Sequence, residues 1–98
     1  MRRYNITNKA VEDLNSIWIY TFETWSEQQA DKYYKELTRE FSIIVSSTKT
    51  NDKNYEEICH GLRGHKCNKH IIFYKRGDDG IITIIRILHE AMDVSNKF

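Results

Sequence analysis

Most residues that could do chemistry lie between Cys59 and Arg76. This stretch has no carboxylate and holds these basic and histidine side chains: His60, Arg63, His65, Lys66, Lys69, His70, Lys75 and Arg76. Arg86 and His89 add one more arginine and one more histidine near the end of the chain. Histidine acts as a general acid or base near neutrality, and arginine or lysine stabilises charge on a phosphate. These residues therefore suit either acid–base chemistry on a phosphate or recognition of an acidic partner.

The two cysteines raise the question of a metal site, because Cys59 and Cys67 lie among three of these histidines. Structural zinc sites normally take four ligands in short paired spacings such as C-x-x-C, and that spacing is absent from the sequence. Lone cysteines more often behave as small buried apolar residues. We therefore expect two reduced thiols, no metal site and no cofactor.

Composition and charge set the broad class of the protein. The 98 residues are 40% hydrophobic and include six Tyr, four Phe and two Trp, which is enough for the core of one domain spanning residues 1–98. The formal net charge is only +1, so no bulk field attracts nucleic acid or a membrane. No segment approaches the roughly 18 apolar residues that a membrane span needs. We expect a cytoplasmic protein with no membrane partner and no sequence-specific nucleic-acid binding.

The first half of the chain predicts a strand followed by two helices. Tyr4 and Ile6 alternate with polar residues, and Thr7 is a suitable helix N-cap. Helical periodicity then begins near Asn8, and a capping box from Ser26 to Gln29 marks the start of a second helix. Almost nothing separates the two helices, so they should form an antiparallel hairpin whose shared apolar stripe needs a further surface to cover it.

The second half predicts an antiparallel sheet. The polar segment from Ser46 to Tyr55 is expected to be a loop, and three strands are expected from Glu57 to Arg63, from His70 to Lys75 and from Ile81 to Leu88. The last two flank Arg76-Gly77-Asp78-Asp79-Gly80, a strong turn sequence. The fold class is therefore α+β, with an N-terminal strand, a two-helix antiparallel hairpin and a three-stranded antiparallel sheet.

Several charged and aromatic residues are expected to have ordinary structural positions. His60 and His65 lie beside glycines and should be solvated, and Trp18 and Trp25 suit a core or the corner of the hairpin. The charges of the second helix should form a solvated face that contributes little stability: Lys32, Lys35, Glu36, Arg39 and Glu40.

Sequence motifs along nearly the whole chain resemble the ParE/RelE superfamily of bacterial toxins, and the ParE branch in particular. The opening and the helix starts resemble the family at Tyr4-Asn5-Ile6-Thr7, Ala10, Asp13-Leu14, Trp25, Gln29-Ala30 and Tyr33. Two later motifs are more specific: Gly61-x-Arg63 followed by His70-Ile71-Ile72-Phe73-Tyr74, and Arg86-Ile87-Leu88-His89-x-x-Met92-Asp93. The chain departs from the family in lacking proline and in carrying Glu90-Ala91 where many relatives have basic residues.

The resemblance implies a RelE-like fold and a toxin of a type II toxin–antitoxin system. Such a toxin would inhibit DNA gyrase, be neutralised by a ParD-like antitoxin and contribute to plasmid stabilisation. Candidate partner-binding residues are Arg63, Tyr74, Arg86, His89 and Asp93. We expect Arg63 and Arg86 on neighbouring strands, and Asp93 paired with one of them if the C-terminal tail folds back.

The rival hypothesis is the RelE branch, whose members cleave mRNA on the ribosome. Its catalytic residues here would be His70, Tyr74, Arg86 and His89. Strand alternation places His70, Ile72 and Tyr74 on one face, and Ile82 and Ile84 on the same face as Arg86. That apolar content favours contact over catalysis, so no catalytic residue is assigned. A third hypothesis is a degenerate module that binds an antitoxin and poisons nothing.

Overall fold

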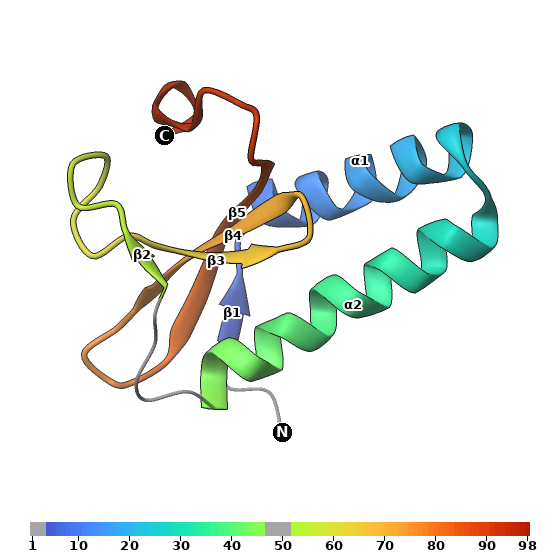
Figure 1. Ribbon diagram of the computed structural model, residues 1–98. Coiled ribbons are helices and arrows are strands. Elements are labelled where there is room, and N and C mark those ends of the chain that lie inside the picture. Colours follow the sequence, from blue (N-terminus) through green and yellow to red (C-terminus); the bar gives the residue numbers. More distant parts are fainter. Residues whose placement is uncertain (1–3, 47–51) are drawn as a thin grey trace.

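A computed structural model describes residues 4–46 and 52–98. Two helices cover one face of a five-stranded sheet (Figure 1). The elements in chain order are β1 (Tyr4–Ile6), α1 (Asn8–Thr24), α2 (Glu27–Ser46), β2 (Lys53–Asn54), β3 (Arg63–Cys67), β4 (His70–Arg76), β5 (Ile82–His89) and the short 3-10 helix η1 (Val94–Lys97). Neither α1 nor α2 is long and apolar enough to cross a membrane.

Both predicted helix starts are confirmed. The Thr7 hydroxyl accepts a hydrogen bond from the Ala10 amide at 3.1 Å and donates one to the Ile85 carbonyl at 2.7 Å, so it caps α1 and attaches it to β5. The Ser26 hydroxyl accepts from the Gln29 amide at 3.1 Å at the start of α2. Only Trp25 and Ser26 separate the helices, which form the expected hairpin (Figure 1).

The sheet is larger than predicted and mixed in direction. Its strand order is β1-β5-β4-β3-β2, and β1 pairs with β5 in parallel while the other pairs are antiparallel. The N-terminal strand thus joins the sheet at the side of β5, which lies between β1 and β4. The first strand in sequence, β1, thus pairs with the last, β5, and no local sequence pattern indicates this pairing.

The segment before β3 differs from the prediction. Residues 57–62 of the predicted strand from Glu57 to Arg63 do not form a strand, because the chain turns there: Gly61 has a φ of +78°, and the Tyr55 amide donates to the Leu62 carbonyl at 2.9 Å. The strand β3 begins only at Arg63. Part of the expected loop is instead the short strand β2, and residues 47–51 of that loop lie outside the described residues.

A β-bulge in β5 changes which side chains face the helices. Phe73 pairs with Arg86 and Tyr74 pairs with Ile84, so Ile85 has no direct partner across β4. As a result Ile82, Ile84 and Ile87 belong to the core beneath the helices, and Ile85 packs on the opposite face. The prediction that Arg86 shares a face with Ile82 and Ile84 is therefore wrong, because simple alternation ignores the inserted residue.

The sheet has an apolar cluster on each face. The larger lies beneath the helices and contains Ala10, Leu14, Leu37, Phe41, Ile44, Cys67, Ile72, Tyr74, Ile82, Ile84 and Ile87. The smaller lies on the other face and contains Tyr55, Leu62, Phe73 and Leu88, with Val94 from η1 packed against it. The rings of Phe73 and Phe98 meet edge to face at 5.2 Å, so the end of the chain also covers this second face.

Candidate functional site

Arg86 is held by a carboxylate from the first helix. Its Nε and Nη2 atoms donate to Asp13 at 2.8 and 3.0 Å, and the Ile87 amide donates to the same carboxylate at 3.0 Å. The two side chains are only 18% and 14% exposed. The hydrogen bond to Asp13 raises the pKa of Arg86, which therefore keeps its charge. This pair fastens α1 to β5 at the bulge.

The predicted partner of Arg86, Asp93, lies elsewhere. Its carboxylate accepts from the Ser95 hydroxyl at 2.8 Å and from the Asn96 side chain at 2.7 Å at the start of η1. The predicted pairing of Asp93 with Arg86 or Arg63 is therefore wrong. Arg63 lies on β3, exposed, and β4 separates that strand from the strand of Arg86, so the two arginines are not on neighbouring strands.

The structure does bring His70 and His89 together. They pair directly across β4 and β5, and their ring centroids lie 5.3 Å apart. Tyr33 of α2 joins them, because its hydroxyl lies 2.6 Å from His70 Nδ1. Burial, followed by the proximity of His89, lowers the pKa of His70 to about 4, and burial raises the pKa of Tyr33 to about 12. Both side chains are thus neutral at pH 7.

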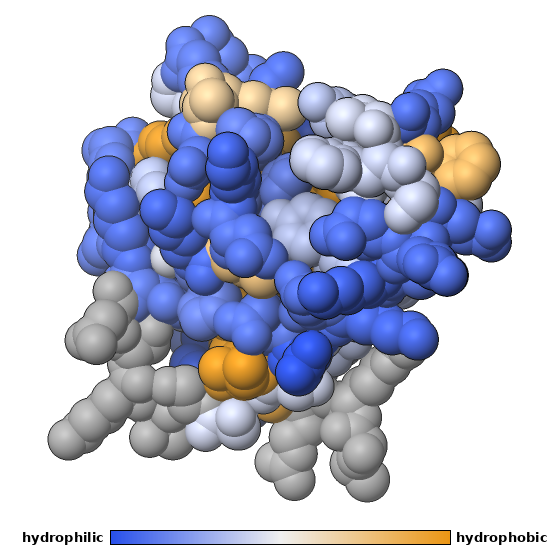
Figure 2. Space-filling model, turned by 45° about the vertical axis from the view of Figure 1, so that its right-hand side comes forward, coloured by the Kyte–Doolittle hydropathy of each residue, from blue (hydrophilic) through white to orange (hydrophobic). Residues whose placement is uncertain are grey.

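A groove of about 910 Å³ opens above this histidine pair. Tyr20 and Trp25 line it from the helix hairpin, Lys69 from the turn between β3 and β4, and Met92 from the segment after β5. Trp25, at the corner of the hairpin as expected, is 76% exposed. Figure 2 shows one side of the molecule as largely hydrophilic, with apolar residues in small separate patches. The groove thus has two exposed aromatic side chains, Tyr20 and Trp25, and aromatic side chains outside it, such as Phe22 and Tyr34, are exposed as well.

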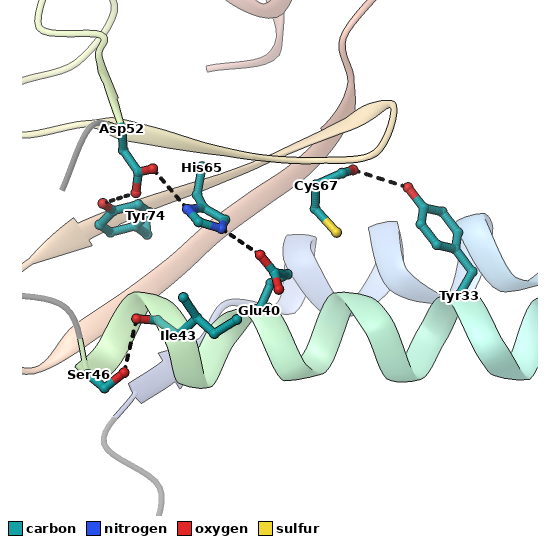
Figure 3. A network of polar contacts seen from close by, with 8 residues as sticks. All are labelled: Tyr33, Glu40, Ile43, Ser46, Asp52, His65, Cys67 and Tyr74. Atoms are coloured by element: carbon teal, nitrogen blue, oxygen red, sulfur yellow. Dashed lines mark hydrogen bonds and ion pairs between the residues drawn. The ribbon is translucent and has the colours of Figure 1, made fainter.

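Tyr74 and His65 belong to a second polar network (Figure 3). The Tyr74 hydroxyl donates to Asp52 at 2.6 Å, and the two ring nitrogens of His65 lie 2.8 Å from Asp52 and 2.8 Å from Glu40. Burial opposes protonation of His65, but the hydrogen bonds to Glu40 and Asp52 outweigh it and raise its pKa. The prediction of a solvated His65 is wrong, because α2 and the segment before β2 enclose the ring.

The second helix is also less solvated than expected. Glu36 accepts from the Asn68 side chain at 3.0 Å in the turn between β3 and β4, and Glu40 contacts His65 on β3. His60 behaves as expected, with a 98% exposed side chain that contacts Glu56 at 3.0 Å. Both cysteines are free, and residues 4–46 and 52–98 contain no cluster of three or more metal-binding side chains.

The residues that sequence reasoning missed are mainly acidic. Asp13, Glu40 and Asp52 bind the basic and phenolic groups of the sheet, and Tyr33 completes the histidine pair. Their spacing gave no signal, because each contact joins segments far apart in sequence. Asp13 and Tyr33 do stand within the motifs quoted for the family resemblance, which is the one sequence feature that set them apart.

Comparison with known proteins gives the family. A family model described as the ParE toxin of the type II toxin-antitoxin system, parDE, matches residues 4–94. The chain belongs to the ParE toxin family. The Toxin ParE1 of Mycobacterium tuberculosis is 30% identical over 95 residues, covering 97% of this chain and 96% of the relative. The Toxin ParE1 of Caulobacter vibrioides is 30% identical over 93 residues, covering 95% and 94%.

A solved structure supports the fold of this ParE. The structure titled "Chromosomal ParDE TA system from P. aeruginosa" matches with a TM-score of 0.65 and 15% identity, covering 89% of this chain and 96% of the other. At this identity the likeness concerns the fold, and it confirms the predicted α+β class. The family assignment confirms a toxin of a type II toxin–antitoxin system, and an antitoxin is therefore a partner of this ParE.

Proposed function

We propose that this ParE inhibits DNA gyrase by contact rather than by catalysis, and that a ParD-like antitoxin neutralises it in the cytoplasm. The observation that supports contact is the separation of the four candidate nuclease side chains. Only His70 and His89 are adjacent, while the Tyr74 hydroxyl binds Asp52 and the Arg86 guanidinium binds Asp13. A nuclease would need these groups around one phosphate, so this arrangement favours a recognition surface.

Proton transfer through His70 is also poorly matched to neutral pH. A general acid or base works best with a pKa near the operating pH. Here the pKa of His70 is lowered to about 4 and that of Tyr33 is raised to about 12, so the two shift away from neutrality in opposite directions. The hydrogen-bonded His70 and Tyr33 are therefore poorly suited to transferring a proton near pH 7.

Some of the predicted partner-binding residues are accessible to a partner, and others are bound within the protein itself. Arg63 is exposed on β3 and His89 lines the groove, so both are candidates for direct contact with gyrase or antitoxin. Tyr74 and Arg86 are instead bound to carboxylates of the protein itself. We assign them a supporting role, and Asp93 the role of fixing the C-terminal turn through Ser95.

Two assays test this function. Purified toxin should inhibit gyrase supercoiling and trap cleaved DNA complexes, and supercoiling that is unaffected at micromolar toxin would exclude gyrase as the target. In a translating extract the mRNA should stay intact. Codon-linked cuts that disappear in His89→Ala would instead establish the nuclease function. A toxin that binds its antitoxin but is inactive in both assays would be a degenerate module.

A further inference from the structure

His65 of β3 lies between two carboxylates that come from different segments (Figure 3). Its Nδ1 atom is 2.8 Å from an oxygen of Asp52, and its Nε2 atom is 2.8 Å from an oxygen of Glu40 on α2. An ionised carboxylate only accepts hydrogen bonds, and a neutral imidazole has a single N–H. Both contacts are therefore hydrogen bonds only when the ring carries two protons. In a neutral ring, one nitrogen would turn its lone pair toward a carboxylate.

The surroundings of the ring favour this doubly protonated form. The side chains of His65, Asp52 and Glu40 are 19%, 12% and 26% exposed, so water screens their charges only in part. Burial opposes the charge on the ring, but the hydrogen bonds to Glu40 and Asp52 outweigh burial and raise the pKa of His65. The ring therefore loses its second proton only as pH rises through this raised pKa.

Further titratable or charged side chains lie on the elements around the ring. The Tyr74 hydroxyl on β4 donates to the second oxygen of Asp52 at 2.6 Å, and Glu36 on α2 binds the turn between β3 and β4. Cys67 of β3 stays a neutral thiol because burial raises its pKa to about 11. The cations of β2 and β3 are exposed to water: Lys53, Arg63 and Lys66. The two carboxylates are therefore the groups whose contact with the ring depends on its second proton.

Asp52 and Glu40 differ in how firmly they are held. Asp52 is the less exposed of the two, and the Tyr74 hydroxyl binds its other oxygen, so its carboxylate is fixed from two sides. Glu40 is more exposed and can turn to water, which solvates it when the hydrogen bond is lost. Loss of the second proton is therefore least costly at Nε2, and the neutral ring keeps its proton on Nδ1, toward Asp52.

The contact at Glu40 belongs to a polar seam between α2 and β3. Tyr33, Glu36 and Glu40 are three and four residues apart, so they lie on one side of the helix. Their contacts on β3 and the turn after it are, in the same order, the Cys67 carbonyl at 3.4 Å, the Asn68 side chain at 3.0 Å and the His65 ring at 2.8 Å. The contact of this seam that lies nearest the end of α2 is thus the one that depends on the second proton of His65.

Apolar packing keeps α2 on the sheet when this contact is absent. Leu37, Phe41 and Ile44 are buried and belong to the core beneath the helices. Loss of the Glu40 contact therefore loosens the second half of α2 and does not detach it. Two other side chains of the seam, Tyr33 and Glu36, line the groove between the hairpin and the sheet.

We propose that His65 is a proton-dependent link between α2 and β3. With two protons the ring binds Asp52 and Glu40 together. When the second proton leaves Nε2 for water, the contact with Glu40 is lost and the second half of α2 becomes more mobile. The link therefore holds the helix hairpin more tightly on the sheet at acidic pH than at alkaline pH. Neither gyrase nor an antitoxin takes part, so the proposed function could fail without affecting this link.

NMR of the imidazole nitrogens in the wild-type toxin tests the protonation itself and needs no variant. At about pH 5.5 both ring nitrogens of His65 should give the signals of an imidazolium, and at about pH 9 only Nδ1 should remain protonated. A neutral ring at both pH values would overturn the proposal. A proton on Nε2 at the higher pH would also overturn it, because Glu40 would then keep its hydrogen bond.

Amide hydrogen exchange tests the effect on the helix. The protection factors of residues 37–46 of α2 should fall by roughly three- to tenfold between about pH 5.5 and about pH 9, as expected for one hydrogen bond between charged groups at a partly exposed site. The protection factors of α1 should change less. Equal changes in both helices, or no change in α2, would refute a local link.

Variants identify the contact that is responsible. Glu40→Gln should lower the pKa of His65 and remove the pH dependence of protection in α2. The matched control is Glu36→Ala, which removes the neighbouring contact of the seam and should lower protection at both pH values while keeping its pH dependence. His60→Gln changes an exposed histidine that contacts a single carboxylate, and it should behave as the wild type does. A pH dependence that survives in Glu40→Gln, or disappears in His60→Gln, would contradict the proposal.

Discussion

The ion pair between Asp13 and Arg86 offers the sharpest test of how the helices are attached to the sheet. In Asp13→Ala, the Ile87 amide loses its acceptor and the Arg86 guanidinium keeps only the Lys97 carbonyl, 3.1 Å from Nη1. The side chains at this site are 14% and 18% exposed. Removing one partner of a buried pair costs about 3–5 kcal/mol, and partial solvent access lowers this to about 2–4 kcal/mol here. For a chain of this length that corresponds to a fall in melting temperature of roughly 10–25 °C.

Urea unfolding of the single and double variants measures this cost. A double-mutant cycle for Asp13 and Arg86 should give a coupling energy above about 1.5 kcal/mol. The matched control is the ion pair between Lys66 and Glu90, whose side chains are 69% and 39% exposed and whose coupling should stay below about 1 kcal/mol. If the two cycles give the same coupling, Asp13 does not fasten α1 to β5 as described.

Three further predictions concern single side chains. Because His65 has a raised pKa in the folded state, the stability lost in His65→Gln should be largest below about pH 6.5 and should shrink as pH rises through the folded pKa, as measured by urea unfolding. The pKa of His70 is lowered to about 4, so its imidazole should show no NMR titration between about pH 5.5 and 8. The contribution of neutral His70 to the free energy of unfolding should decrease only as pH drops from about 6.5 toward 4. Gly64→Ala places a Cβ 2.6 Å from Tyr55 and 2.8 Å from Ile71, and thermal unfolding should reveal a loss of about 1–3 kcal/mol.

The helical part of the fold could be predicted because its determinants are local. Thr7 and Ser26 each bond to an amide three residues later, so the sequence spacing itself describes the contact. The turn between β4 and β5 is equally local, since the Gly77 and Ile81 backbones bond to each other. Each of these predictions needed only neighbouring residues.

The sheet was predicted less well, because the wrong predictions concern contacts between strands. The bulge at Ile85 follows from how β4 and β5 pair, and alternation along β5 alone cannot reveal it. The strand β2 has only two residues, and it exists because Lys53 and Asn54 find partners on β3. Its polar composition resembles a loop when the partner strand is not considered.

The charge of the candidate site could not be predicted for the same reason, because it depends on residues from distant segments. The stretch from Cys59 to Arg76 contains no acid, yet Asp52 and Glu40 enclose His65, and Glu90 contacts Lys66 at 3.1 Å. Acidic residues from other segments therefore offset part of the positive charge that the sequence places between Cys59 and Arg76. What remains for a partner is a smaller set of exposed cations, such as Arg63 on β3.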